Sequence, residues 1–472
     1  MLNKTMKFIL ILLFIFTPIA FGSMELWAFS LMELGILLLI ILWSIHHLMR
    51  YAPACQPGRE FGVQNFKYEM IFLSFFLILV LFQIIPLPAG ITKVLSPKTY
   101  ELRQSLANAI PQSAIHNPQF PISFVPFITK IEFYKWLTLI AFLLFLLHWK
   151  YFGDEFRVTN QLIAVIFLVG VFESLYGMFE FFSGHQHILN LKGISSVTGT
   201  FINRNYFAGY LLMVIPLSMG FFFSREALHA VRFKGWRQRL SSLDGKTLLI
   251  GFGIMVMILG LIFSASRMGI LSLLLSFTLI SILFKNPQRG KGFSKTTILI
   301  LGLAVLWALW IGLDAVIGRF FNVSEDLKWR WTTWEDTFKV VKDYPILGTG
   351  LGTFSQMFPM YKSFHMRRFV SHAENDFLQL ASEVGLIGMG ILLILFIFLF
   401  VRAVSGIRSM SVKDSGRYIG IGGLVGILAL MFHSMVERNL QVPANAFLFT
   451  FIWALVLKAA FLRPGEKVIT GD

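Results

Sequence analysis

Residues 247–284 read TLLIGFGIMVMILGLIFSASRMGILSLLLSFTLISILF, which is two apolar runs separated only by residues 264–267. A helix of about 20 mostly apolar residues is long enough to cross the hydrocarbon core of a bilayer. Two such runs, separated by so short a break, predict a tight hairpin of two spanning helices. The break frees backbone groups, which Ser264 and Ser266 are suited to satisfy. This stretch therefore predicts an α-helical membrane protein.

Apolar runs of this kind recur along the whole chain. The protein has 472 residues, of which 56% are hydrophobic and only 14% are charged, whereas soluble domains carry about 25% charged residues. We expect spans near residues 6–21, 26–46, 69–87, 133–149, 161–182, 205–223, 247–264, 268–284, 297–313, 377–401, 418–435 and 444–462. The first is expected to be uncleaved, because a second follows at once. The sequence thus predicts one integral membrane domain, residues 1–472, with an all-α polytopic fold of about 12 transmembrane helices.

Basic residues give the chain a formal charge of +16, and they are dispersed over the loops between apolar runs. This dispersion argues against nucleic acid as a partner. Lysine and arginine concentrate in residues 225–246, 285–295 and 402–417, which are loops on one side of the membrane. By the positive-inside rule, these loops and both termini are expected in the cytoplasm. The single cysteine, Cys55, allows no disulfide within the chain.

Two loops on the opposite, outer side are too long to be turns. We expect residues 88–132 to form short helices and irregular backbone on the outer membrane face. In residues 314–376, the stretch WRWTTWEDTFKVVKDYP has apolar side chains at helical spacing, and Pro345 ends the predicted helix. The glycine-rich turn GTGLGTF follows, and a second helix is expected over residues 354–364. Residues 314–376, the cap segment, are therefore predicted to form a helical cap inserted between transmembrane helices.

Three arginines stand where apolar runs break on the outer side: Arg204 in TFINRNYFAGYLL, Arg267 in FSASRMGILSLLL and Arg330 in KWRWTTWED. An arginine at the end of a spanning helix is costly to place unless an anion meets it. Its planar guanidinium matches phosphate oxygens, and a helix N-terminus favours an anion at the same spot. The alternative for each is an anchor at the membrane interface. Three together indicate a phosphate-bearing substrate. The candidate supporting residues beside them are Ser264, Ser266, Asn203 and Asn205.

The densest polar group at any predicted helix entrance is His372, Glu374, Asn375 and Asp376, in SHAENDFLQLASEVGLIG. A histidine beside a carboxylate has the components of a general base oriented by a second group. The alternative is that Asn375 or Asp376 caps the following helix and His372 is exposed. A metal or other cofactor is not expected, because one histidine and scattered carboxylates lack a ligand spacing. P-loop, Rossmann and nucleophile-elbow motifs are absent from the sequence.

Taken in order, these segments resemble the O-antigen ligase family, which also includes O-antigen polymerases and protein O-oligosaccharyltransferases. The resemblance covers about residues 160–460 and rests on TGTFINRNYFAGYLLMVIPL, FSASRMGILSLLL, RWTTWEDTFKVVKDYPILGTGLGTF and HAENDFLQLASEVGLIG. The upstream PLPAGITKVLSP is also similar to this family. The resemblance implies a GT-C-like fold in the bacterial inner membrane. It further implies metal-independent transfer of a glycan from undecaprenyl diphosphate at the periplasmic face, where residues 88–132 and the cap segment would lie.

Residue by residue, the resemblance implies binding roles for the three arginines. Arg267 matches the arginine of the family's Ser-x-Ser-Arg motif. Arg330 matches the arginine that opens the outer-loop helix, and Arg204 lies in the polar break before a middle span. Arg267 and Arg330 are therefore expected to hold the diphosphate, with Arg204 assisting. The matching supporting positions are Asn203, Asn205 and Asn375.

One position departs from the family pattern. Many relatives have His-Asn where this chain has Glu374 and Asn375, and its histidine stands two residues earlier, at His372. His372 and Glu374 are both candidates for the base that takes the proton of the acceptor hydroxyl. We favour His372, since Glu374 also fits an orienting or capping role.

The sequence therefore predicts a glycan transferase of the O-antigen ligase type, surrounded by membrane lipids. A polymerase of the same family differs only in its acceptor, a growing polysaccharide in place of lipid A–core, and the sequence does not separate the two. A transporter of lipid-linked glycans is the alternative of another class. It predicts internal repeats and ionisable residues near the membrane midplane, whereas the charges singled out here gather at the outer ends of the predicted spans.

Overall fold

The computed structural model describes residues 2–50, 66–108, 119–149, 152, 156–183, 196–229, 244–283, 324–364, 369–412 and 414–461. Helices dominate these residues, and the predicted all-α polytopic fold is confirmed. The elements are α1 (Leu2–Ile19), η1 (Phe21–Ser23), α2 (Leu26–Arg50), α3 (Lys67–Ile84), β1 (Leu87–Pro88), α4 (Ala89–Leu95), α5 (Pro97–Asn108), β2 (Gln119–Phe120), α6 (Pro126–His148), α7 (Phe156–Ser183), α8 (Arg204–His229), α10 (Gly245–Phe263), α11 (Arg267–Leu283), α14 (Ser324–Asp343), α15 (Phe354–Met357), η5 (Phe358–Met360), α16 (Asp376–Ser409), α17 (Ser415–Ser434) and α18 (Pro443–Phe461).

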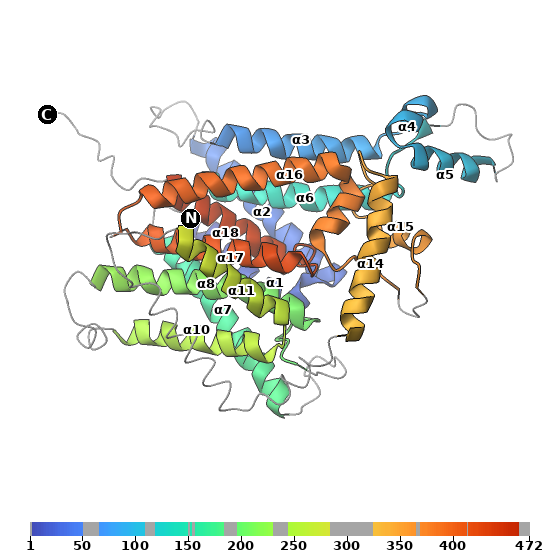
Figure 1. Cartoon of the computed structure of the whole chain (residues 1–472). Helices are drawn as coiled ribbons and strands as arrows, with labels where there is room; N and C mark the ends of the chain where they lie inside the picture. Colours follow the sequence, from blue (N-terminus) through green and yellow to red (C-terminus); the bar gives the residue numbers. More distant parts are fainter. Residues whose placement is uncertain are drawn as a thin grey trace.

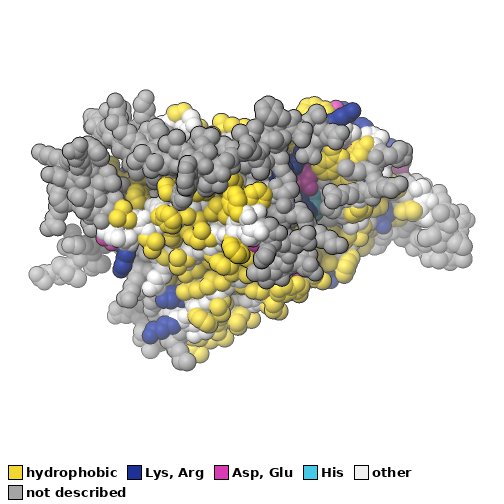
Figure 2. Space-filling model, turned by 90° about the horizontal axis from the view of Figure 1, so that it is seen from below, with side chains coloured by type: hydrophobic (Ala, Val, Ile, Leu, Met, Phe, Trp, Pro, Cys, Tyr) yellow, Lys and Arg dark blue, Asp and Glu magenta, His cyan; other side chains and the backbone are white. Residues whose placement is uncertain are grey.

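The predicted spans correspond to helices of the structure. Within the described residues, nine helices are long and apolar enough to cross a membrane, and two shorter apolar helices, Tyr68–Ile84 and Arg267–Ile280, accompany them. Together these match every predicted span except 297–313, which lies outside the described residues. Figure 2 shows one face of the molecule, where hydrophobic side chains cover most of the described surface. Such a surface suits contact with lipid.

Helix α8 lies at the centre of the bundle, because the apolar stretch of its span is buried throughout. It packs most closely against α17, where glycines remove side chains from the contact. A Cβ on Gly422 of α17 would lie 2.3 Å from the carbonyl oxygen of Pro216 in α8. A Cβ on Gly220 would lie 2.5 Å from the carbonyl oxygen of Tyr418. Small residues therefore let the two backbones approach, as is common between membrane helices.

The elements outside the long helices gather at one end of the bundle. In Figure 1 the long helices lie side by side, α14 runs across their ends, and α4, α5 and α15 lie near it. We call this the cap end. At the opposite end, Trp149 Nε1 donates to Asn3 Oδ1 over 3.3 Å, and Lys458 Nζ donates to the Trp149 carbonyl over 2.7 Å. The start of α1 and the end of α18 therefore meet there, away from the cap end.

The helix predicted in the cap segment is present as α14, which ends at Asp343, just before Pro345. The face of α14 that carries tryptophan and phenylalanine is not its buried face, because the side chains of Trp331 and Phe338 are 63% and 51% exposed. Threonines are buried instead, and each bonds a carbonyl of its own helix: Thr333 Oγ1 to Trp329 O at 2.9 Å and Thr337 Oγ1 to Thr333 O at 2.7 Å. Such bonding satisfies a hydroxyl inside a helix without another partner.

The second predicted helix of the cap segment, 354–364, is shorter than expected. The chain forms α15 and then the single 3₁₀ turn η5, which ends at Met360. Pro359 lies in this turn and has no N–H to continue an α-helix. In the segment predicted over residues 88–132, the short helices α4 and α5 lie between the strands β1 and β2, which pair antiparallel with Leu87 opposite Phe120.

Candidate functional site

The polar residues before α16 lie at the cap end. One of them caps the helix, and the others make different contacts. Asn375 Oδ1 accepts from Leu378 N over 3.0 Å, so Asn375 is the N-cap of α16. Glu374 stands one residue earlier with φ of 51°, a left-handed conformation that is uncommon for a side chain of this size. Since Asn375 performs the capping, the carboxyl of Glu374 is available for other contacts.

Asp376 ties the start of α16 to the turn between α17 and α18. Its Oδ2 accepts from Asn439 N over 2.8 Å and from Leu440 N over 2.9 Å. The side chain of Asn439 turns back toward α17, where Nδ2 lies 3.2 Å from His433 Nδ1. These contacts fix the backbone of the turn, and with it the positions of Glu437 and Arg438.

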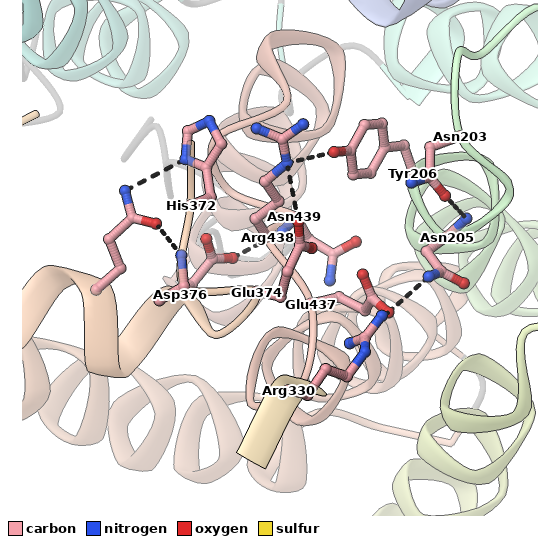
Figure 3. Close-up of polar contacts among 12 residues, drawn as sticks. Asn203, Asn205, Tyr206, Arg330, His372, Glu374, Asp376, Glu437, Arg438 and Asn439 are labelled. Carbon is pink, nitrogen blue, oxygen red and sulfur yellow. Dashed lines mark hydrogen bonds and ion pairs between the residues drawn. The ribbon is translucent and has the colours of Figure 1, made fainter. Parts of the chain in front are cut away.

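Arg330 reaches from α14 to this turn. Its Nη2 lies 2.5 Å from Glu437 Oε1, and its Nη1 donates to the Val436 carbonyl. Asn205, in the first turn of α8, donates from Nδ2 to the same Glu437 oxygen over 2.6 Å. Figure 3 shows Arg330 and Asn205 converging on Glu437 from different helices. One buried carboxylate thus joins α14, α8 and the α17–α18 turn.

Arg438 makes the neighbouring set of contacts. Its guanidinium donates from Nε to the Tyr206 hydroxyl and lies over the Tyr206 ring, 5.1 Å from the centroid. The same Nε is 3.9 Å from Glu374 Oε1. Figure 3 shows the hydrogen bond to Tyr206 and the ion pair with Glu374 as dashed lines. Arg330, Glu374, Glu437 and Arg438, together with Asn205 and Tyr206, form what we call the charged cluster.

The two glutamates of the charged cluster perturb each other. Burial, followed by the nearby Glu437 charge, raises the pKa of Glu374 to about 8, although Arg330 acts in the opposite direction. Burial also raises the pKa of Glu437, while Arg330 and Asn205 favour its charged form. The pKa of Glu374 is therefore raised into the range where its carboxyl takes up and releases a proton near neutral pH.

The other predicted binding residues begin helices at the same end. Arg204 is the first residue of α8 and Arg267 the first of α11, and both are partly buried. Asn203 Oδ1 accepts from Asn205 N over 2.9 Å, so Asn203 shapes the start of α8. The start of α11 is tied to α17, because Ser266 Oγ lies 3.4 Å from His433 Nε2.

The Ser264–Arg267 break is a tight turn, as the hairpin prediction required. Ala265 has φ of 53°, and Ser266 N donates to Ser264 Oγ over 3.3 Å. Ser264 Oγ also donates to the Leu261 carbonyl over 2.6 Å. Ser264 thus satisfies backbone groups at the break as predicted, whereas the Ser266 hydroxyl contacts His433 of α17 instead.

His372 does not contact Glu374 directly. Its Nδ1 lies 3.3 Å from Gln379 Nε2, one turn into α16. Gln379 in turn contacts the buried Glu383, with Nε2 2.9 Å from Glu383 Oε1. The glycine-rich turn GTGLGTF packs on the far side of Glu383, where Gly352 N donates to Oε2 over 2.8 Å. This turn therefore supports α16, and the interpretation of GTGLGTF as a turn is confirmed.

Sequence reasoning gave too little weight to several residues that the structure brings to the site. Glu437 and Arg438 follow α17 in VERNLQ, and a pair of opposite charges directly after a spanning helix was the available signal. Tyr206 and Gln379 carried no such signal, since both lie inside apolar helical patterns. In the part of the chain that the structure describes, no three His, Cys, Asp or Glu side chains form a candidate metal site.

Comparison with known protein families gives one match. Residues 252–393 match the family described as O-antigen ligase, and the resemblance predicted from the sequence is confirmed there. The matched segment includes Arg267, Arg330, His372 and Glu374, whereas Glu437 and Arg438 lie beyond it. No curated protein matches the chain at a significant level. The chain is thus a multi-pass membrane protein with a segment that is similar to the O-antigen ligase family.

Proposed function

We propose that the protein transfers a saccharide from a polyprenyl diphosphate, undecaprenyl diphosphate in particular, to an acceptor hydroxyl at the periplasmic end of the bundle. The observation that carries the proposal is the charged cluster, in which Arg330 and Arg438 meet Glu374 and Glu437 at the cap end of an apolar bundle. Arginines suit a diphosphate, and a carboxyl with a raised pKa suits proton transfer near neutral pH. The matched family supports the same class of reaction.

In the proposed step, the acceptor oxygen attacks the anomeric carbon of the donor saccharide. The new carbon–oxygen bond forms as the bond from the anomeric carbon to the phosphate oxygen breaks. The electron pair of the broken bond leaves with the polyprenyl diphosphate, and the acceptor proton passes to a carboxylate. Arg330, Arg267 and Arg204 stabilise the charge that develops on the leaving diphosphate, in the role that positioned cations have in phosphoryl chemistry.

We assign the base to Glu374 rather than to His372. Asn375 caps α16, so Glu374 has no capping role. Its carboxyl lies beside Arg438 and Glu437, and its raised pKa is close to neutral, where a base both ionises and accepts protons effectively. Tyr206 and Asn205 hold the two partners of Glu374 in place.

The test is transfer by the purified protein in lipid nanodiscs, with an undecaprenyl-diphosphate-linked oligosaccharide as donor. Lipid A–core is offered as acceptor in one reaction and a second lipid-linked oligosaccharide in another, which separates a ligase from a polymerase. Product in either reaction, unchanged after EDTA treatment, is expected. Lack of product with both acceptors would reject the proposal, and activity restored only by Mg²⁺ would reject the arginine-based mechanism.

The proposed side of the membrane is tested separately. Reporter fusions after Met360 in the cap segment and after Ser411 beyond α16 should report opposite compartments, with Met360 in the periplasm. Helix α16 lies between these points; it is kinked at Gly385, which has non-helical backbone angles, and it is long enough to cross the bilayer. A cytoplasmic signal at Met360 would contradict the periplasmic site.

A further inference from the structure

The orientation of the Gln379 side-chain amide is fixed by its neighbours. Oε1 lies 3.1 Å from Ala373 N, which can only donate, so this atom is the amide oxygen. Nε2 lies 2.9 Å from Glu383 Oε1, an acceptor. The opposite amide orientation would place an oxygen against the Glu383 carboxylate and an N–H against another N–H. Gln379 is therefore held in one orientation.

This orientation determines which nitrogen of His372 carries the proton. The amide group of Gln379 has two hydrogens, and one is directed to Glu383 Oε1. The other is directed to His372 Nδ1, 3.3 Å away. Nδ1 must then accept, and a neutral imidazole whose Nδ1 accepts carries its hydrogen on Nε2.

Glu383 is in turn held by the glycine-rich turn. Its Oε2 accepts from Gly352 N over 2.8 Å, and its backbone carbonyl accepts from Gly350 N over 2.9 Å. Glu383 is only 3% exposed, and Gln379 is likewise 3% exposed. The series Glu383, Gln379 and His372, which we call the relay, thus starts from two buried side chains of α16.

The protonated nitrogen of His372 is left for a substrate. His372 is partly exposed, and no residue that the structure describes pairs with Nε2. In Figure 3, the His372 imidazole and the Arg438 guanidinium lie on the same side of Glu374 and Glu437. An N–H donor and a guanidinium both match anionic phosphate oxygens.

We propose that Gln379 and Glu383 are positioning residues that hold neutral His372 as an Nε2–H donor to a phosphate oxygen of the lipid-linked donor. His372 then stabilises the leaving diphosphate and does not remove the acceptor proton. This inference rests on the proposed function for the identity of the ligand, whereas the protonation pattern of His372 is a property of the protein alone.

The first experiment measures that pattern without any reaction. Nitrogen-15 NMR spectra are recorded for histidine-labelled protein in nanodiscs and for His372→Gln, and the difference gives the two His372 nitrogens. A protonated Nε2 and an unprotonated Nδ1 are expected. Gln379→Leu, which removes the amide hydrogen, should produce a mixture of both neutral forms. A wild-type spectrum with the proton on Nδ1 would overturn the proposal, even if no variant folds.

The second experiment separates a donor from a base by turnover. Glutamine can place an N–H near the position of Nε2, whereas asparagine reaches only the position of Nδ1. Removal of a preorganised donor to a developing oxyanion lowers turnover by about 10²–10³-fold. His372→Ala and His372→Asn should show this loss, and His372→Gln should remain within about tenfold of wild type, since an amide N–H can replace the donor.

Equal loss in His372→Gln and His372→Ala, with both variants folded, would indicate a base and reject the donor role. The two proposals fail in different ways. Wild-type protein without transfer activity would reject the proposed function and leave the NMR result intact. Wild-type transfer with the proton on Nδ1 would reject only the role of the relay.

Discussion

Two arginine–glutamate pairs of similar exposure lie at opposite ends of the bundle. At the cap end, Arg330 and Glu437 have side chains that are 21% and 5% exposed. At the other end, Arg402 of α16 pairs with Glu69 of α3, and these side chains are 27% and 6% exposed. Each pair joins two elements that are distant in sequence. Composition, burial and sequence separation therefore do not distinguish them.

The surroundings of the two pairs differ. Arg402 packs between aromatic rings, 5.3 Å from the centroid of Phe398 and 4.5 Å from that of Phe461. Glu437 instead meets further polar groups, Asn205 and the carboxyl of Glu374, and Arg438 lies beside them. An aromatic setting supports packing. A second carboxyl beside Glu437 raises the energy of the ion pair by charge repulsion and does not support packing. Such an arrangement is typical of functional sites.

The largest expected effect is the loss of the Glu374 carboxyl. Glu374→Gln should lower turnover by about 10²–10⁴-fold, because a general base contributes that much. Donor binding should persist, since Arg330 remains. The measurement is single-turnover transfer together with donor binding. Glu335→Gln, on the exposed face of α14, is the matched control and should be near wild type. Normal turnover in Glu374→Gln would exclude it as the base.

The two ion pairs can be compared directly with parallel variants. Arg330→Met should weaken donor binding by about 10–100-fold, the size expected for a hydrogen bond to a charged group. Both Arg330→Met and Arg402→Met should destabilise the protein, because each leaves a buried glutamate without its cation.

The corresponding double variants separate binding from stability. Arg330→Met/Glu437→Gln and Arg402→Met/Glu69→Gln should both recover thermal stability, since no buried charge is left unpaired. Donor affinity should stay low in the first and normal in the second. Equal effects of the two arginines on donor affinity would mean that both pairs are structural.

Activity and stability should change with pH in opposite directions. Below its raised pKa of about 8, Glu374 is mostly protonated, so turnover should increase with pH up to that value, by about tenfold per unit at the steep part. The folded protein binds this proton more tightly than the unfolded chain. Stability from this group is therefore present below the ordinary value of 4.5 and is lost as pH rises toward 8. Melting temperatures of wild type and Glu374→Gln, compared across this range, should converge at low pH and separate at high pH.

The smallest effect concerns the packing that holds the α17–α18 turn. A Cβ on Gly209 of α8 would lie 2.2 Å from Asn439 Oδ1 and 3.0 Å from Asn445 Nδ2. Gly209→Ala should displace Asn439 and lower the free energy of unfolding by about 1–3 kcal/mol, with a few-fold loss of turnover. Gly390→Ala in α16 is the control, because its Cβ would meet no atom within 4 Å. Chemical denaturation of both variants would show whether the turn depends on this space.

The sequence alone predicted the spans that the structure describes, the hairpin at residues 264–267 and the helix of the cap segment. These features follow from hydropathy and helix-ending residues, which act over a few neighbouring positions. It also indicated Arg330, His372 and Glu374, since polar residues at the ends of apolar runs are visible without any partner.

The contacts that these residues make with one another depend on the tertiary structure. Glu437 meets Asn205 and Arg330 across separations of 232 and 107 residues, and no local pattern specifies such contacts. Gln379 and Glu383 are four residues apart on α16, a spacing that the sequence shows, yet the contact of Gln379 with His372 depends on the direction of the loop before the helix. Hydropathy is a property of each segment, whereas the protonation of Glu374 and the donor nitrogen of His372 depend on groups brought together by packing.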